Sequence, residues 1–386
     1  MSAQLHKSGP MRILQVITRM NVGGPAIEID QLMKSLDPEK FESHLVTGAC
    51  QSNEIDFLEN KVIAYSYRKI DSMKRSISPI RDLLSIFKLM WIIYEFKPHI
   101  IHTHTAKAGL LGRLASLPFL RSVRVVHTFH GHVLEGYFSK PVTIFFRSLE
   151  KLLSKTTHQF IVVGTSIKSE LLSYGIGSKD RFNVIHPGVE LEDTLSPAEE
   201  SVVSENFNLA FVGRLTQIKR VDRLIESVKL VDLKQGNSKI FLHIIGDGEL
   251  RNSLQTLALK LGIRVKFYGW QANVLSLIAQ MDCVIITSDN EGTPISLIEA
   301  GLLKKPTIST NVGSVNEVII HEVTGLICNL DPEDISGAIL KIMNNNELAL
   351  KYGTAAQQYL TKEFSVRQFV SSHESLYEFV FDSITP

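Results

Sequence analysis

The sequence predicts an α/β protein made of two Rossmann-like, doubly wound domains that face a cleft. Three observations support this prediction. A chain of 386 residues suits two domains of this class better than one or three. Short apolar segments of strand length alternate with helical segments, which is typical of parallel sheets. The alternation halts in an acidic, turn-rich stretch at residues 191–205 and then restarts, so we expect one domain at 1–190 and a second at 191–386.

The first half opens with an apolar strand at Arg12–Thr18, the glycine pair Gly23-Gly24 and a helix at Ala26–Leu36. Pro25 then falls in the first helical turn, where its missing N–H costs nothing. Strand, glycine loop and helix in this order begin a βαβ unit. The further strands expected in this half are His44–Thr47, His99–His102, Arg124–Val126, Gln159–Val163 and Asn183–His186.

The second half repeats the same pattern of strands and helices. Its expected strands are Asn208–Val212, Ile240–Ile245, Val265–Tyr268, Cys283–Thr287 and Thr307–Ser309. The helices expected between them are Val221–Val231, Leu250–Leu261, Val274–Met281 and one that opens after Glu291. The segment Pro332–Phe381 reads as mostly helical, and its last helix is able to cross back to the first domain.

Charge is distributed unevenly over an otherwise ordinary globular composition. The chain is 44% hydrophobic and 21% charged, with a net charge of +1. Residues 1–190 hold 24 Lys and Arg against 16 Asp and Glu, a net charge of +8, and the remainder carries −7. The overall neutrality argues against a dedicated nucleic-acid binder, whereas the basic first half favours an anionic surface or acceptor.

The cysteines and the apolar stretches indicate in which cellular compartment the protein is expected. Cys50, Cys283 and Cys328 are scattered and form no CxxC pair, which indicates a reducing, cytoplasmic setting. Met1–Pro10 lacks the apolar core of a signal peptide. Leu83–Phe96 is too short to span a bilayer. Its pattern fits either a core-facing helix or an interfacial one, so a peripheral position on the inner face of the membrane remains an open expectation.

The most informative segment runs from Glu291 to Glu299, with Gly292, Thr293 and Pro294 at its start. Pro294 marks a first helical turn, so Glu291 is expected at the carboxyl end of a strand, where open α/β sheets bind ligands. Free N–H groups at the helix N-terminus suit anionic or hydroxyl oxygens. Glu299 should lie roughly 7–8 Å further along the helix axis. The two carboxylates could therefore hold two parts of one elongated ligand.

This segment resembles the glutamate, seven residues, glutamate signature of retaining GT-B glycosyltransferases, and in particular glycosyltransferase family 4. The resemblance covers nearly the whole chain and is closest to members that build bacterial surface polysaccharides. It implies that Glu291 contacts hydroxyls of the donor sugar and that Glu299 binds the ribose of a nucleotide diphosphate sugar. It also implies retention of configuration, without a protein nucleophile and with assistance from the leaving phosphate.

Two cations follow the first strand of the second half. Arg214 and Lys219 are expected in a loop at the carboxyl end of that strand, where a guanidinium and an ammonium can neutralise a diphosphate. The family pattern places an Arg and a Lys at this spacing. No Asp-x-Asp motif occurs in the chain. We therefore expect no metal and no cofactor, with the sugar nucleotide, by preference a UDP-sugar, as co-substrate.

Three glycines are further candidates for contact with the donor. Gly24 could present its backbone N–H to the donor phosphate. Gly246 and Gly248 follow another strand, at the place where the family binds the nucleobase. Turn glycines are common at such positions, so a purely structural role stays open for all three.

Histidines gather in two segments of the first half. His127, His130 and His132 follow one strand, but no Cys or acidic residue at ligand spacing completes a zinc site. The family resemblance places His130 near the donor sugar, as a catalytic residue beside Glu291, Arg214 and Lys219. His104 and Lys107 end another strand, and they are candidates for an anionic acceptor or for packing at a helix start.

The prediction as a whole is a retaining glycosyltransferase. Its N-terminal domain should bind a glycan or polyprenyl-linked glycan acceptor, its C-terminal domain should bind the nucleotide sugar, and an anionic membrane surface is a candidate partner. The alternative of another class is a sugar-nucleotide 2-epimerase of the same architecture. A catalytically inactive sensor is a third interpretation, which the presence of Glu291, Arg214, Lys219 and His130 disfavours.

Overall fold

A computed structural model describes residues 9–383 of the chain, apart from 52–53, 60–61, 132–139, 192–204, 237–238 and 272. The chain divides into two compact units, Met1–Gly188 with Val366–Pro386, and Val189–Ser365. The last helix, α13 (Val366–Asp382), groups with the first unit, which agrees with the expectation that the final helix could cross back. The acidic stretch expected to link the domains lies almost wholly outside the described residues.

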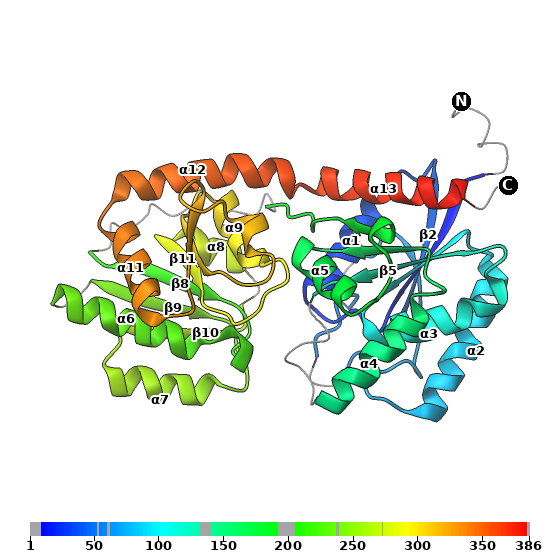
Figure 1. The fold of residues 1–386 in the computed structure, drawn as a ribbon, viewed down its shortest axis with the longest axis horizontal. Helices are drawn as coiled ribbons and strands as arrows, with labels where there is room; N and C mark the ends of the chain where they lie inside the picture. Colours follow the sequence, from blue (N-terminus) through cyan, green and yellow to red (C-terminus); the bar gives the residue numbers. More distant parts are fainter. Residues whose placement is uncertain are drawn as a thin grey trace. The chain divides into compact units, whose positions relative to one another are not determined.

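The first unit is built on a seven-stranded parallel sheet (Figure 1). Its strand order is β3-β2-β1-β4-β5-β6-β7. The strands are β1 (Met11–Ile17), β2 (Phe41–Gly48), β3 (Ser66–Ile70), β4 (Ile100–His104), β5 (Arg124–Phe129), β6 (Gln159–Val162) and β7 (Phe182–Val184). The order reverses between β1 and β4, so the first unit has a topological switch point at the carboxyl ends of these two strands.

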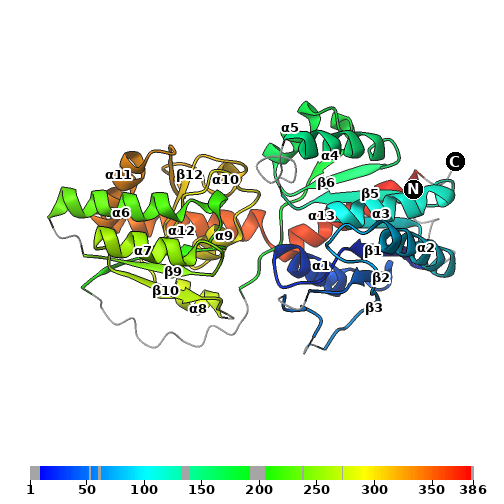
Figure 2. The same ribbon diagram turned by 90° about the horizontal axis from the view of Figure 1, so that it is seen from below.

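Helices cover both faces of this sheet, because successive side chains of a strand point to opposite faces. Ile13 of β1 packs with α13 and α1, whereas Leu14 and Val16 pack with α2 and α3. Figure 2 shows α1 and α13 beside the sheet from below. The helices are α1 (Gly24–Ser35), α2 (Pro79–Phe96), α3 (Ala106–Ser116), α4 (Lys140–Leu153) and α5 (Thr165–Ser173), with short 3-10 turns η2 (Leu117–Phe119) and η3 (Lys179–Arg181).

The second unit holds a six-stranded parallel sheet in the order β10-β9-β8-β11-β12-β13. Its strands are β8 (Phe207–Val212), β9 (Ile240–Ile245), β10 (Val265–Gly269), β11 (Cys283–Ile286), β12 (Thr307–Thr310) and β13 (Gly325–Cys328). Its helices are η4 (Gln217–Lys219), α6 (Val221–Gln235), α7 (Arg251–Leu261), α8 (Val274–Ala279), α9 (Ile295–Leu302), α10 (Val315–Val318), α11 (Pro332–Met343) and α12 (Asn346–Glu363). The order reverses between β8 and β11, which places a second switch point there.

Two strands, β3 and β13, were not predicted from the sequence, and both lie at an edge of a sheet. β3 exposes four of its five residues, so it lacks the apolar pattern that marks a buried strand. β13 is only four residues long and pairs with β12 alone. Edge strands are fixed by the neighbouring strand that they pair with, and a local pattern carries little of that information.

Candidate functional site

The switch point of the second unit brings together the two segments that the sequence analysis singled out. β8 and β11 are neighbours in the sheet, and both are parallel. The loop after β8 carries Arg214 and Lys219, and the loop after β11 carries Glu291. Because parallel strands end at the same edge, residues 72 positions apart in sequence become direct neighbours.

Glu291 and Lys219 form a close ion pair at this edge. Lys219 Nζ donates to both carboxylate oxygens of Glu291, at 2.6 and 2.7 Å. The hydroxyl of Ser288 donates to Oε1 of the same carboxylate at 2.5 Å. The Glu291 side chain is only 8% exposed, whereas that of Lys219 is 26% exposed. The pair therefore holds a carboxylate in a fixed orientation while the ammonium stays accessible.

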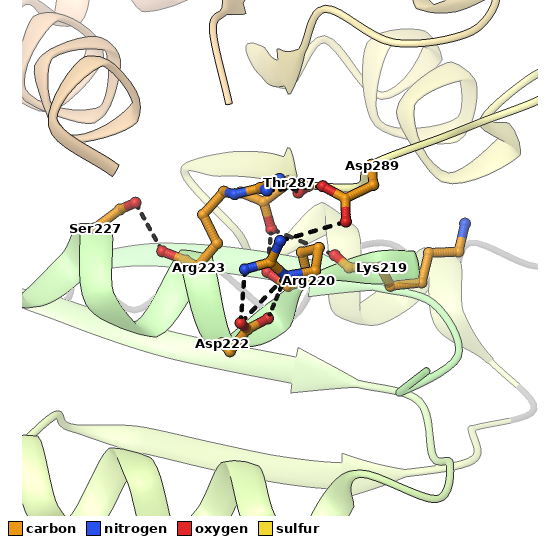
Figure 3. A network of polar contacts seen from close by, with 7 residues as sticks. All are labelled: Lys219, Arg220, Asp222, Arg223, Ser227, Thr287 and Asp289. Carbon is orange, nitrogen blue, oxygen red and sulfur yellow. Dashed lines mark hydrogen bonds and ion pairs between the residues drawn. The ribbon is translucent and has the colours of Figure 1, made fainter. Parts of the chain in front are cut away.

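A polar network behind this pair fastens the two loops to each other (Figure 3). Arg223 donates to the carbonyl of Thr287 and to the carboxylate of Asp289, both at 2.7 Å. The hydroxyl of Thr287 donates to the carbonyl of Arg220 at 2.9 Å. Arg220 also pairs with Asp222 and Asp289. The Lys219 side chain extends away from this network in Figure 3, which leaves its ammonium for Glu291.

The backbone after Glu291 leads directly into a helix. Pro294 caps α9, so Gly292 and Thr293 lie just before the free N–H groups of its first turn. Gly313 approaches this loop so closely that a Cβ there would stand 1.7 Å from the carbonyl oxygen of Glu291, and its φ is +54°. A side chain at position 313 would displace the Glu291 backbone, so this glycine fixes the shape of the loop.

Glu299 lies on α9, about one turn into the helix, and is partly buried. Burial raises the pKa of its carboxyl group to about 7. Among the described residues the structure records no hydrogen-bond partner for this carboxylate. A desolvated carboxylate without a partner is poised to accept hydroxyl groups, because such bonds would replace the lost hydration.

The raised pKa of Glu299 predicts a pH dependence of stability. The folded state binds a proton more readily than the unfolded state, so stability should fall as the pH rises from 5 to 8. We expect Glu299→Gln to remove about 2–3 kcal/mol of this fall, since each pKa unit corresponds to about 1.4 kcal/mol. Urea unfolding of the wild type and the variant at pH 5 and pH 8 measures the difference. Parallel losses in both proteins would contradict the prediction.

The remaining candidate residues of the second unit differ in their exposure and in how closely their neighbours pack against them. Arg214 is exposed, and within the described part of the chain its side chain has no recorded partner. Gly246 and Gly248 have a structural reason to be glycine, since a Cβ would stand 2.0 Å from the carbonyl oxygen of Gly213 and 2.4 Å from that of Leu215. These two glycines let the loops after β8 and β9 touch, and a ligand contact remains a prediction.

In the first unit, Gly24 is the first residue of α1 and follows the end of β1. The N–H groups of Ala26 and Ile27 donate to the carbonyl of Gly23, and Pro25 has no N–H, so the Gly24 N–H is the one in this turn for which the described residues record no partner. Glu28 lies one turn further along, and a Cβ at Gly24 would lie 3.8 Å from its Oε1. The expected anion site at Gly24 therefore has a carboxylate as its neighbour.

His130 is not free to point into solvent, because both of its ring nitrogens are engaged. Nδ1 lies 3.1 Å from Glu28 Oε2, and Nε2 lies 3.0 Å from Nδ1 of His104. His104 in turn contacts Gln15 Oε1 at 2.8 Å and is 2% exposed. An acceptor contact by His104, as the sequence suggested, would need an exposed side chain, and the structure places this residue in the interior instead.

Lys107 also differs from the expectation of an acceptor contact. Its ammonium lies 2.6 Å from Asp82 of α2 and also donates to the carbonyl of Ser76. Asp82 accepts the backbone N–H of Ser78 at the start of α2. Lys107 therefore joins α3 to the first turn of α2, which is the packing role that the sequence left open.

Several residues of these clusters were missed by sequence reasoning. Ser288 and Gln15 have no motif, Glu28 lies on a helix already assigned to the glycine loop, and Tyr377 is distant in sequence. Only the position of Glu28, one turn after Gly24, could have suggested a role. His132 lies outside the described residues. Within the described ranges, no group of three or more His, Cys, Asp or Glu residues is arranged to hold a metal ion.

Comparison with known proteins assigns both halves of the chain. A family described as Glycosyltransferase Family 4 matches residues 22–193, and one described as Glycosyl transferases group 1 matches residues 194–359. The chain is 27% identical to the UDP-Gal:alpha-D-GlcNAc-diphosphoundecaprenol alpha-1,3-galactosyltransferase of Escherichia coli, over 82% of this chain and 84% of that protein. It is 26% identical to the capsular polysaccharide biosynthesis glycosyltransferase CapM of Staphylococcus aureus, over 89% and 91%. Anabaena Alr3699/HepE in complex with UDP shares the fold, with a TM-score of 0.77 at 19% identity over 96% of this chain and 100% of that one.

Proposed function

The chain belongs to the glycosyltransferases of family 4 and group 1, with the GT-B fold and a nucleotide-sugar donor, and from this membership we propose a more specific reaction. It transfers a hexosyl or N-acetylhexosaminyl group from a UDP-sugar to a hydroxyl of a polyprenyl-linked glycan, with retention of configuration. The E. coli relative named above is a UDP-Gal transferase that acts on a diphosphoundecaprenol-linked sugar, and Anabaena Alr3699/HepE has been solved with UDP and with UDP-glucose. These names support UDP as the donor nucleotide and a lipid-linked acceptor.

The observation that carries the proposal is the cluster at the switch point of the second unit. Two cations, Arg214 and Lys219, and one oriented carboxylate, Glu291, lie in neighbouring loops at the carboxyl edge of the sheet. The cations suit a diphosphate, and the carboxylate suits sugar hydroxyls. The unpartnered carboxylate of Glu299, on the same helix that Glu291 precedes, suits the ribose. One sugar nucleotide satisfies all of these groups.

The chemistry that these residues support is displacement of the nucleoside diphosphate. The bond between the anomeric carbon and the β-phosphate oxygen breaks, and the acceptor oxygen bonds to the same face of the sugar. The acceptor proton passes to the leaving phosphate. Negative charge builds on that phosphate in the transition state, and Arg214 and Lys219 are the residues proposed to stabilise it.

The surface of α2 supports an acceptor that is linked to a lipid. This helix buries Leu89, Ile92 and Ile93 against the sheet, as a core-facing helix should. Its opposite side is also apolar and exposed, and the exposed residues recur at helical spacing. They are Ile80, Leu83, Leu84, Phe87, Trp91 and Tyr94, and we call them the α2 stripe. The core-facing interpretation of this segment thus describes one side of the helix, and the interfacial interpretation describes the other.

Basic residues surround the α2 stripe. Arg75, Arg81 and Lys88 are exposed, and Lys74 is partly so. An apolar stripe bordered by cations suits shallow insertion into an anionic leaflet, where each cation adds about 1 kcal/mol of attraction. No helix among the described residues is long and apolar enough to cross a membrane. We therefore propose that the enzyme meets its lipid-linked acceptor through peripheral contact on the inner face.

Product analysis tests the reaction class. Incubation with a UDP-sugar should release UDP only when a polyprenyl diphosphate-linked sugar is supplied, and NMR of the product should show the anomeric configuration of the donor. Added EDTA should leave the rate largely unchanged, because the two cations take the place of a metal. Inverted product would overturn retention. A 2-epimerised sugar formed without any acceptor would favour the epimerase, which the comparisons do not favour.

Binding to liposomes tests the membrane contact. Co-sedimentation should rise with anionic lipid and fall with salt, because the attraction is partly electrostatic. Reversing the charge at Lys74, Arg75 and Arg81 together should lower the bound fraction several-fold. The matched control reverses three exposed lysines of the second unit, Lys239, Lys260 and Lys351, and should bind like the wild type. Equal recovery in the supernatant with and without anionic lipid would favour a soluble acceptor.

A further inference from the structure

A continuous chain of hydrogen bonds runs through the interior of the first unit and ends at His130 and Glu28. It joins seven side chains from β1, β4, β5, α1 and α13. In order, Glu28 Oε2 lies 3.1 Å from His130 Nδ1, His130 Nε2 lies 3.0 Å from His104 Nδ1, and His104 Nε2 lies 2.8 Å from Gln15 Oε1. Gln15 Nε2 then lies 3.0 Å from the Tyr377 hydroxyl, which is 2.7 Å from His102 Nδ1, and His102 Nε2 is 2.6 Å from Thr128 Oγ1. We call this the buried relay.

The interior members of the relay are cut off from water. Gln15, His102 and Tyr377 are 0% exposed and His104 is 2% exposed. A buried polar atom without a partner destabilises the folded state, so each nitrogen and oxygen along the relay must donate where its neighbour accepts. The direction of one hydrogen bond therefore fixes the direction of the next, and the tautomers of His102 and His104 cannot be chosen independently.

The orientation of Gln15 in the structure fixes one direction. Its amide nitrogen donates to Tyr377, so the tyrosine hydroxyl donates to His102 Nδ1, and His102 carries its proton on Nε2. On the other side the amide oxygen accepts from His104 Nε2, which leaves Nδ1 of His104 to accept from His130 Nε2. Since His130 Nε2 is already protonated, its contact with Glu28 through Nδ1 needs one more proton. In this direction the pair His130–Glu28 holds an extra proton.

The opposite direction arises when the Gln15 amide turns over. The amide nitrogen then donates to His104 Nε2, and His104 donates from Nδ1 to His130 Nε2. His130 is left neutral with its proton on Nδ1, facing an ionised Glu28. Tyr377 donates to the amide oxygen, and His102 moves its proton to Nδ1 and accepts from Thr128. All groups are again satisfied, with one proton fewer in the whole chain.

We propose that Gln15 is a positioning residue that couples the protonation of the His130–Glu28 pair to the tautomers of His104 and His102. Loss of one proton from the pair turns the amide and moves the ring proton of each buried histidine from Nε2 to Nδ1. Gain of the proton reverses each step. Nothing is oxidised or reduced, and solvent at the His130 end is the only source of the proton.

The neighbouring side chains do not take up the exchanged proton, so it resides on the His130–Glu28 pair. The titratable groups that share a pocket or an electrostatic interaction with His130 are Glu28 from α1, His102 and His104 from β4, His127 from β5 and His373 from α13, whereas Tyr377 lies further along the relay. Burial lowers the pKa of His102, His104 and His127 well below the usual range, and that of His373 to about 4. Burial likewise raises the pKa of Tyr377 beyond the physiological range. These groups therefore stay neutral while the pair gains or loses its proton.

The consequence lies at the N-terminus of α1, one turn from Glu28. The pair is neutral overall with the extra proton and carries one negative charge without it. An anion at Gly24 is therefore disfavoured once the proton leaves, by a charge only one helical turn away. This consequence rests on the prediction from the sequence that Gly24 presents its backbone N–H to a phosphate. The proton movement itself does not, because it can be observed without any donor.

Nitrogen-15 NMR of the histidine rings in the full chain tests the relay. Spectra between pH 5 and 9 report which ring nitrogen carries a proton, with His102→Asn, His104→Asn and His130→Asn used for assignment. As His130 loses its proton, His104 and His102 should change from the Nε2-H to the Nδ1-H form at the same pH. His127, which contacts Thr103 outside the relay, should keep one form and serves as the internal control.

Two substitutions at Gln15 separate the relay from a merely structural contact. Gln15→Leu should abolish the change at His102, because nothing then connects Tyr377 to His104. Gln15→Glu should keep His104 in the Nε2-H form at every pH, since a carboxylate only accepts. If His102 and His104 each keep one tautomer while His130 titrates in the wild type, the coupling does not exist, whether or not the variants fold. A protein that shows the coupled change but no transferase activity would refute the proposed function and leave the relay intact.

Discussion

Replacing Glu291 with alanine is expected to lower kcat/KM by about 10- to 100-fold while the fold is retained. The substitution removes the carboxylate proposed to bind the sugar hydroxyls, and charge-assisted hydrogen bonds of this kind contribute about 1.5–3 kcal/mol. It also frees the Lys219 ammonium, which donates to both oxygens of Glu291. Because Lys219 is partly exposed, water can replace that contact, and the effect on stability should be smaller than the effect on turnover. Steady-state kinetics with thermal unfolding measures both.

The conservative variant and a matched control sharpen this test. Glu291→Gln keeps the shape of the side chain and the hydrogen bond from Ser288 but loses the charge, so it should lie between the wild type and Glu291→Ala. Glu226→Ala removes an exposed glutamate from α6, away from both loops, and should leave kcat/KM unchanged. Unchanged kcat/KM in Glu291→Ala would remove this residue from the active site.

Replacing Lys219 with alanine should weaken the binding of a nucleoside diphosphate at least tenfold and the binding of the free nucleoside little. Of the donor, the ammonium is proposed to contact only the diphosphate, so the affinity for a ligand without phosphate should change little when the ammonium is removed. The structure adds a second effect, because Glu291 is only 8% exposed and would keep Ser288 as its sole recorded partner. An unpaired, largely buried carboxylate costs stability, which should lower the melting temperature as well.

Calorimetric titration with UDP and with uridine separates these effects. Lys260→Ala removes an exposed lysine of α7 in the same unit and should change neither affinity. The double variant with Glu291→Ala and Lys219→Ala should regain part of the stability lost in Lys219→Ala, since no buried charge is then left unpaired. Equal losses of affinity for UDP and uridine in Lys219→Ala would show that this residue acts elsewhere than at the phosphates.

The sequence predicted most of the strands because their apolar runs are short, buried and bounded by turn residues. The expected strand Ile240–Ile245 coincides with β9, and Asn208–Val212 falls within β8. The alternation of strands and helices was sufficient for the parallel doubly wound class, which the comparisons confirm. The polar edge strand β3 lacked any such pattern, and its pairing with β2 is seen only in the tertiary structure.

The cluster of the second unit could be predicted from the sequence to a greater extent than the histidine cluster of the first unit. The segments around Arg214, Lys219 and Glu291 stand at ends of predicted strands, and the roles that the family resemblance implies for them remain predictions. That Lys219 and Glu291 form a pair depends on β8 and β11 being neighbours, and strand order is set by packing of the whole sheet. The histidines were visible in the sequence too, but their roles were not.

What the sequence by itself determined is therefore the fold class and the apolar pattern of α2, and it also named the segments that we propose carry the chemistry. The tertiary structure alone decided which of those residues are accessible and what each one touches. His104 became an interior link to Gln15, and Lys107 became a partly exposed link to Asp82, because their strand and helix pack against those residues. Tyr377 meets Gln15 across 362 residues, since α13 covers the sheet of the first unit. Local pattern records which face of an element is apolar, whereas the contacts between distant side chains arise only when those faces are packed together.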